Sequence, residues 1–268
     1  MKKYRNLIIK IMLPVISICI LETCLLDAEA ADKEELNKSI IKTKVYSASA
    51  DNPNYVLGEF STDYDQSKAR AINVERAADL IDGTVLQPDE LFSYNTVVGE
   101  RTKENGFVSA PAYAGGKVVK STGGGICQTA TTLFDASLLA GFIPTDRQCH
   151  SQSVHYVDAG LDAGIAWGTK DFCFVNTLDI PITIHMTYAN GTITASISAS
   201  EENVCTYKPV VRKTGKKSTR TYLLEYDKYG ELIMVYSIGN SSYKDKSVVS
   251  EENLITDDEL TTLYEQEY

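Results

Sequence analysis

The run Gly123-Gly124-Gly125, directly before Ile126-Cys127-Gln128, constrains the fold of this chain more than any other stretch. Consecutive glycines are costly to order, so they occur where the backbone turns sharply or approaches another group closely. A series at helical spacing follows and ends at Gly141, a C-terminal stop: Ile126, Ala130, Leu133, Phe134 and Ser137. The sequence therefore predicts a helix that begins just after the glycines, with Cys127 in its first turn.

A cysteine in this position can act as a nucleophile. The free N–H groups and the positive dipole end of a helix N-terminus favour thiolate over thiol. The nearby backbone N–H groups, at Gly124, Gly125 and Gln128, could then form an oxyanion hole. The competing interpretation is a small buried residue beneath a tight loop.

The first 30 residues have the features of a targeting segment. An apolar run over 11–20 leads to Ala28-Glu29-Ala30, which fits a signal-peptidase site, and it follows a basic start of Lys2, Lys3, Arg5 and Lys10. We expect a signal peptide over 1–30, with an uncleaved N-terminal anchor as the alternative. Either would place the rest of the chain outside the cytoplasm.

The chain is acidic, with a formal net charge of −10 at pH 7. This charge argues against nucleic acid or an anionic membrane as the main partner. We therefore expect membrane contact only through an uncleaved N-terminal segment. The basic stretch 206–220 has two interpretations, a solvated face or a contact with an anionic wall polymer.

Four cysteines lie beyond the leader: Cys127, Cys149, Cys173 and Cys205. If Cys127 is a free nucleophile, at most one disulfide can form among the other three. A zinc site formed by Cys127, Cys149, His150 and Cys173 is another alternative, although the spacing fits no standard zinc knuckle. We expect neither a metal nor a cofactor.

The pattern along the chain predicts an α+β fold, with the Cys127 helix packed on a mostly antiparallel sheet. A further helix is expected within 66–80, with a core face of Ala69, Ile72, Ala77, Leu80 and Ile81. Strands are expected at 55–62, 85–86, 91–95, 154–157, 164–167 and 171–175, and hairpins around 114–117, Asn190-Gly191 and Tyr229-Gly230.

This pattern divides the chain into five segments. They are a leader (1–30), a polar arm (31–54), a main domain (55–205), a small β-hairpin appendage (206–250) and an acidic flexible tail (251–268).

A nucleophilic cysteine needs a base and usually an orienting partner for that base. His150 and His155 are the candidate bases, because His185 lies on the solvated face of a strand and is interpreted as structural. For the orienting partner we consider Asp162 first and Asp171 in reserve. The order of Cys on a helix, then His, then Asp is reminiscent of papain-like and transglutaminase-like cores, at the level of layout alone.

The glycine–cysteine block, 122–142, resembles the signature of VanW-domain proteins. Upstream similarities lie at 70–74, 91–95, 98–102 and 106–107, and downstream ones at Arg147, His150-Ser151, 154–157, Gly160, Asp162-Ala163 and 171–176. The resemblance covers about residues 55–200, and residues 220–243 resemble the short β tail that such proteins often carry.

The resemblance implies a bacterial, extracytoplasmic protein linked to the cell wall and to glycopeptide resistance. Some members with this domain are understood to act as L,D-transpeptidases through the domain's cysteine. Carried over, Cys127 is the nucleophile and His150 the base, with His155 in reserve.

Two functions are therefore open. The first is cysteine-dependent acyl transfer on peptidoglycan stem peptides, in which a thioester on Cys127 is resolved by an amine or by water. The second is a wall-associated accessory or binding module without catalysis, with Cys127 buried and remote from His150.

Overall fold

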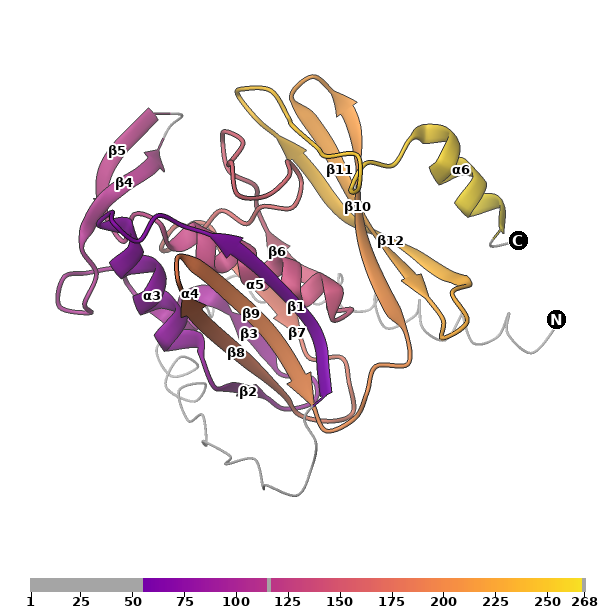
Figure 1. Ribbon diagram of the computed structural model, residues 1–268, viewed down its shortest axis with the longest axis horizontal. Helices are drawn as coiled ribbons and strands as arrows, with labels where there is room; N and C mark the ends of the chain where they lie inside the picture. Colours follow the sequence, from indigo (N-terminus) through magenta and orange to yellow (C-terminus); the bar gives the residue numbers. More distant parts are fainter. Residues whose placement is uncertain (1–54, 115–116, 267–268) are drawn as a thin grey trace, which may run out of the picture. The chain divides into compact units, whose positions relative to one another are not determined.

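The computed structural model describes residues 55–114 and 117–266. The expected leader (1–30) and polar arm (31–54) lie outside the described residues. Within the described part the protein is α+β, with mostly antiparallel sheets and few helices (Figure 1).

The four helices of the described part are α3 (Arg70–Ile81), α4 (Tyr94–Val98), α5 (Ile126–Leu139) and α6 (Asp257–Gln266). The strands of the first half are β1 (Tyr55–Asp63), β2 (Thr84–Leu86), β3 (Leu91–Ser93), β4 (Ser109–Ala114), β5 (Lys117–Thr122) and β6 (Pro144–Arg147). Those of the second half are β7 (Phe172–Val175), β8 (Ile182–Ala189), β9 (Thr192–Ala199), β10 (Thr206–Gly215), β11 (Ser218–Tyr226) and β12 (Leu232–Ser242).

These strands form four antiparallel sheets. Their orders are β1-β9-β8-β2, β3-β7-β6, β10-β11-β12 and the hairpin β4-β5. The β8–β9 hairpin turns at Asn190 and Gly191, both with positive φ, which confirms the hairpin expected from Asn-Gly. The β11–β12 hairpin is also confirmed, and the basic segment before it pairs with β11 as a third strand.

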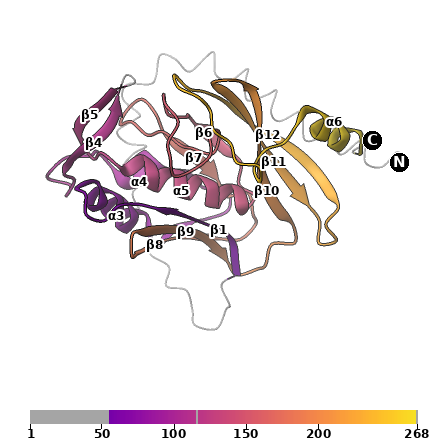
Figure 2. The same ribbon diagram turned by 45° about the horizontal axis from the view of Figure 1, so that its top comes forward.

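Helix α5 is the centre of the fold. One side lies against β1 and β9 (Figure 2). The other meets β7, where the rings of Phe134 and Phe172 pack edge to face with centroids 5.6 Å apart. Because both sides are covered, nearly every residue from Ile126 to Leu138 is buried, and not only the one face that helical spacing indicated.

Helix α3 is present, and its expected core face is confirmed for Ala77 and Ile81 but wrong for Ala69 and Ile72. Ile72 is 51% exposed, whereas Val74, Ala77, Ala78 and Ile81 are fully buried. The burial of Asn73 explains the shift, since its side chain bonds both the N–H and the C=O of Val108 and the C=O of Gly124. This polar side chain therefore fixes the rotation of the helix and ties it to the glycine run.

Other expected elements also differ. Residues 154–157 form no strand, and of 164–167 only Ala166 makes a bridge, to Lys170. The strand expected at 91–95 ends at Ser93, whose hydroxyl accepts a hydrogen bond from the Thr96 N–H and so starts α4. The sequence pattern missed β6.

The acidic end of the chain contains a helix where a flexible tail was expected. Leu260 of α6 is 5% exposed and belongs to a small cluster with Ile255 and the outward-facing residues of β10 and β11. The inward-facing residues of the same strands, Val211 and Leu223, belong to the main core instead. Residue 205 is therefore not a boundary of the hydrophobic core.

Candidate functional site

Cys127 is the second residue of α5, and the backbone around it is unusually close-packed. A Cβ on Gly124 would lie 2.5 Å from the Ala110 carbonyl oxygen, and Gly125 has φ +113° at the N-cap. Both positions therefore require glycine. The Cys127 Sγ lies 3.4 Å from the Ile165 nitrogen, which donates to it, and 3.6 Å from the Ile165 carbonyl oxygen.

His150 and Asp162 lie on loops without regular structure, and His150 is close enough to this sulfur to affect its pKa. The His150 Nδ1 is 2.6 Å from the Asp162 Oδ2, and the His150 backbone N–H donates to the same oxygen at 2.6 Å. The two bonds fix both the backbone and the ring of His150 relative to one carboxylate. With Nδ1 engaged in this way, Nε2 is the ring nitrogen left to serve the thiol.

The second oxygen of Asp162 is also held. Arg147 Nη2 lies 3.2 Å from Oδ1, and the Tyr243 hydroxyl donates to the same oxygen at 2.5 Å. Arg147 donates further to the Asp162 and Gly160 carbonyls and, through Nη1, to the Ser241 hydroxyl. All these side chains lie away from solvent, so the carboxylate has no freedom to rotate.

The pKa shifts of the three groups agree with a thiolate–imidazolium pair. Burial alone would raise the pKa of Cys127, but the hydrogen bond and charge of His150, the Ile165 N–H and the Arg101 charge lower it below its usual range. Burial would lower the pKa of His150, but its bonds to Asp162 and Cys127 raise it. Burial opposes ionisation of Asp162, whose pKa is nevertheless lowered by His150 and Arg147.

Of the expected oxyanion donors Gly124, Gly125 and Gln128, only Gly125 keeps a backbone N–H without a partner among the described residues. The Gln128 side chain is fully buried and bonds Thr62, the Asp63 carbonyl and Arg70, so it cannot reach a substrate. The N–H groups of Gly124, Ile126 and Gln128 donate to carbonyls within the turn. Among the described residues, the N–H groups of Gly125 and Cys127 remain as donors without a protein partner.

The reserve residues are placed elsewhere. Asp171 accepts bonds from the Ser93 hydroxyl and from the N–H groups of Asn95 and Phe172, so it organises the start of α4 rather than a histidine. His155 is exposed and lies in a loop, with its ring against Tyr156. His185 bonds the Ser198 hydroxyl at 2.9 Å, consistent with a structural role.

Arg101 is a residue that the spacing arguments did not single out. Its guanidinium lies over the rings of Tyr94 and Trp167 and donates to Asn95, while Nε and Nη2 have no hydrogen-bond partner in the described part. The stem of Arg101 packs on Gly123, where a Cβ would lie 2.7 Å away. The first glycine of the run thus admits a cation that favours the Cys127 thiolate.

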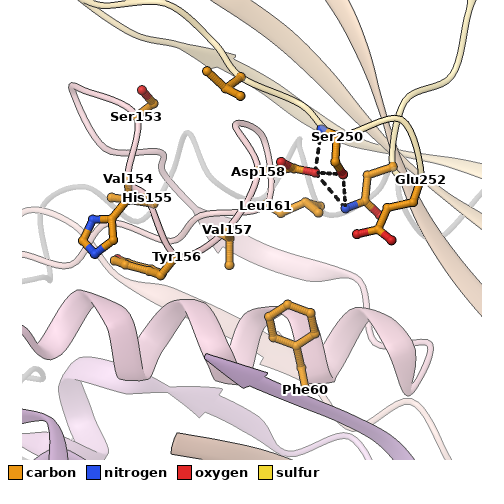
Figure 3. Close-up of a pocket in the computed structure, with 12 residues that line it drawn as sticks. Phe60, Ser153, Val154, His155, Tyr156, Val157, Asp158, Leu161, Ser250 and Glu252 are labelled. Atoms are coloured by element: carbon orange, nitrogen blue, oxygen red, sulfur yellow. Dashed lines mark hydrogen bonds between the residues drawn. The ribbon is translucent and has the colours of Figure 1, made fainter. Parts of the chain in front are cut away.

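The described residues also form a pocket of about 690 Å³, which is not lined by Cys127, His150 or Asp162. Figure 3 shows it between the loop that carries His155 and Tyr156 and the segment that carries Ser250 and Glu252, with Phe60 of β1 beneath. Tyr156 lines this pocket, and its pKa is raised by burial and by the charges of Cys127 and Asp162.

The four described cysteines are free thiols. Within 55–114 and 117–266, no group of three or more His, Cys, Asp or Glu side chains could hold a metal ion. No helix in the same residues is long and apolar enough to span a membrane.

Comparison with known proteins finds similarity over the same region. Residues 69–198 match the profile described as "VanW like protein". Uncharacterized protein YoaR of Bacillus subtilis (strain 168) is 40% identical over 146 residues, or 54% of this chain and 48% of that protein. Vancomycin B-type resistance protein VanW of Enterococcus faecalis (strain ATCC 700802 / V583) is 26% identical over 159 residues, which are 56% of this chain and 55% of that protein.

This chain spans about half the length of the curated relatives it matches. No solved structure is a significant match.

Proposed function

Since residues 69–198 of this chain are a domain of the VanW-like family, we propose that the protein is an extracytoplasmic cysteine acyltransferase acting on peptidoglycan stem peptides. The observation that carries the proposal is the arrangement of Cys127, His150 and Asp162. A thiol in the first turn of a helix lies beside a histidine whose Nδ1 is 2.6 Å from a buried carboxylate. The layout also supports comparison with papain-like and transglutaminase-like cores, in which such sets perform acyl transfer.

The chemistry follows from these groups. The Cys127 thiolate attacks the carbonyl carbon of a donor amide, and the N–H groups of Gly125 and Cys127 stabilise the oxyanion. His150 gives its proton to the departing amine, which leaves a thioester on Cys127. An acceptor amine attacks the thioester, loses a proton to His150 and displaces the thiolate, which restores the starting pair. With water as acceptor, the product is a carboxylic acid.

Peptidoglycan is proposed as substrate on three grounds. They are the leader-like residues 1–30, the acidic charge that disfavours nucleic acid, and the resistance to a cell-wall antibiotic named in one relative. In the L,D-transpeptidase form of the reaction, the acceptor is the amine of a second stem peptide and the product is a cross-link.

The test compares the full chain with its Cys127→Ala variant on purified muropeptides, with products separated by mass. We expect the wild type to form cross-linked or trimmed products and Cys127→Ala to lose more than about a thousandfold in rate. Cys173→Ala is the matched control, because it removes a thiol that lies in β7 outside the pair.

Equal product formation by wild type and Cys127→Ala would overturn the proposal and leave the accessory role. Loss of product in Cys173→Ala to the same extent would show that the effect of Cys127→Ala is not specific to the nucleophile.

A further inference from the structure

The sheet β10-β11-β12 lies outside the matched residues 69–198, yet the residues that follow β12 reach the catalytic carboxylate. We infer that Tyr243 is a positioning residue, which acts through Asp162 to hold His150 against Cys127. The catalytic unit therefore continues through residue 243. This inference rests on the proposed function, because it assigns Tyr243 a role in the same site.

The first support is the hydroxyl of Tyr243. It donates to Asp162 Oδ1 at 2.5 Å and accepts the Gly160 N–H at 2.7 Å, so both its donor and an acceptor position are used. The side chain is buried, and burial with the charge of Asp162 raises the pKa of Tyr243, so the hydroxyl stays a neutral donor. A hydrogen bond to a buried carboxylate is among the stronger ones in proteins.

The second support is that the two carboxylate oxygens of Asp162 have different partners. Among the described residues, Asp162 Oδ2 contacts only His150, through its ring and its backbone N–H, whereas Oδ1 accepts from Tyr243 and Arg147. The Tyr243 bond is much the shorter on Oδ1, since Arg147 Nη2 is 3.2 Å away. Without Tyr243 the carboxylate could rotate about its bond to Cβ, and the ring of His150 would rotate with it.

The third support is that other atoms of the sheet anchor the same loop. Ser241 accepts a bond from Arg147, and Thr221 of β11 donates to the Gly160 carbonyl at 2.8 Å. A Cβ on Gly160 would lie 2.8 Å from the Thr221 hydroxyl, so the loop and the sheet are in tight contact there. One wall of the pocket, with Ser250 and Glu252, continues from the same segment (Figure 3).

The test uses Tyr243→Phe, which removes one hydroxyl and keeps the ring. The rate of alkylation of Cys127 by iodoacetamide is measured against pH in the full chain, with the alkylated residue identified by mass spectrometry. Tyr236→Phe is the matched control, because it removes a hydroxyl that bonds Glu225 at 2.6 Å in the same sheet.

We expect alkylation of Cys127 at neutral pH to be about tenfold slower in Tyr243→Phe, since a hydrogen bond to a charged group is lost. The midpoint of the alkylation profile should rise toward that of an ordinary thiol, because a less firmly held imidazolium stabilises the thiolate less. The low-field proton resonance of the His150 Nδ1–H should weaken or disappear. Tyr236→Phe should match wild type in all three measurements.

A profile of Tyr243→Phe that superimposes on that of wild type would overturn the inference. The readout needs no substrate, so it separates this inference from the proposed function. If wild-type Cys127 itself alkylates like an ordinary thiol, the proposed function fails. If wild type shows a low midpoint that Tyr243→Phe does not change, only the role of Tyr243 fails.

Discussion

Cys127 and Cys173 show how the surroundings shift the pKa of the same side chain in opposite directions. Burial raises the pKa of both thiols. Around Cys173 the charge of Asp171 acts in the same direction, and the pKa reaches about 12. Around Cys127 the cations of His150 and Arg101 outweigh burial. The lowered pKa of Cys127 supports the proposal that this thiol, and not Cys173, is the nucleophile.

Asp135 is a buried carboxyl that the proposed chemistry does not use. It lies in α5, is 1% exposed, and neither of its oxygens has a hydrogen-bond partner in the described part. Burial and the charges of Asp162 and Asp158 raise its pKa well above the ordinary value, against the opposing charge of Arg147. The group is therefore protonated when folded over a pH range in which it is ionised when unfolded.

Because of this difference, we expect the substitution Asp135→Asn to increase the free energy of unfolding relative to wild type, and to do so more at higher pH. Above the unfolded pKa, wild type takes up a proton on folding at Asp135, so its stability falls as pH rises, by at most about 1.4 kcal/mol per unit. The variant has no such dependence. The free energy of unfolding by urea, measured from pH 4 to pH 8, should shift increasingly in favour of Asp135→Asn.

A difference between Asp135→Asn and wild type that stays constant across this pH range would contradict the raised pKa of Asp135. An increase with pH in the stability of wild type relative to Asp135→Asn would show that folding lowers the pKa of Asp135 instead of raising it.

Cys127 and His150 could be proposed as site residues from the sequence. The hydrogen bonds of Arg147 and Tyr243 to Asp162 could not. Cys127 was identifiable because the glycine run and helical spacing are local signals, and His150 because few histidines are present and a family resemblance favoured one. Arg147 and Tyr243 donate to Asp162 across separations of 15 and 81 residues, which no spacing pattern encodes. The catalytic roles of Cys127 and His150 and the positioning role of Tyr243 stay predictions.

At the scale of elements, the site is assembled from a helix end and two irregular loops. The sequence predicted a strand at 154–157 from β-branched and aromatic residues, but the structure ties this loop down with side chains. Asp158 accepts a hydrogen bond from Ser250 (Figure 3). Asp158 also accepts from Asn253, and Ser153 donates to Asp245. These distant partners override local propensity, which is a weak predictor for short segments.

The contact between the 158–163 loop and β11 can be tested with a pair of glycines. Gly160 and Gly168 both have positive φ, but a Cβ at Gly160 would meet Thr221 and Thr219, whereas nothing lies within 4 Å at Gly168. Gly168→Ala should cost about 1 kcal/mol of backbone strain. Gly160→Ala should cost about 2–4 kcal/mol in urea unfolding, since overpacking is added.

Gly160→Ala should also slow alkylation of Cys127, because Gly160 bonds Tyr243, Arg147 and Thr221. Equal destabilisation by the two substitutions would show that the loop does not depend on this contact.

At the scale of the whole described molecule, one hydrophobic core joins parts that the sequence divided. The α+β class and the central helix were predictable from hydrophobic periodicity and turn residues. The sharing of a core was not, because Val211, Leu223 and Tyr243 pack with residues of α5 and the 69–198 region only through the tertiary fold. The matched domain therefore depends on the sheet that follows it for both packing and positioning.

If Cys127 carries an acyl group during the proposed reaction, that group can be trapped on its sulfur. The full chain is mixed with a muropeptide donor without acceptor, quenched in acid, and mapped by mass spectrometry. We expect a donor acyl group bound as a thioester to Cys127, which hydroxylamine releases. Product formation without any adduct, or an adduct on another cysteine, would contradict the proposal.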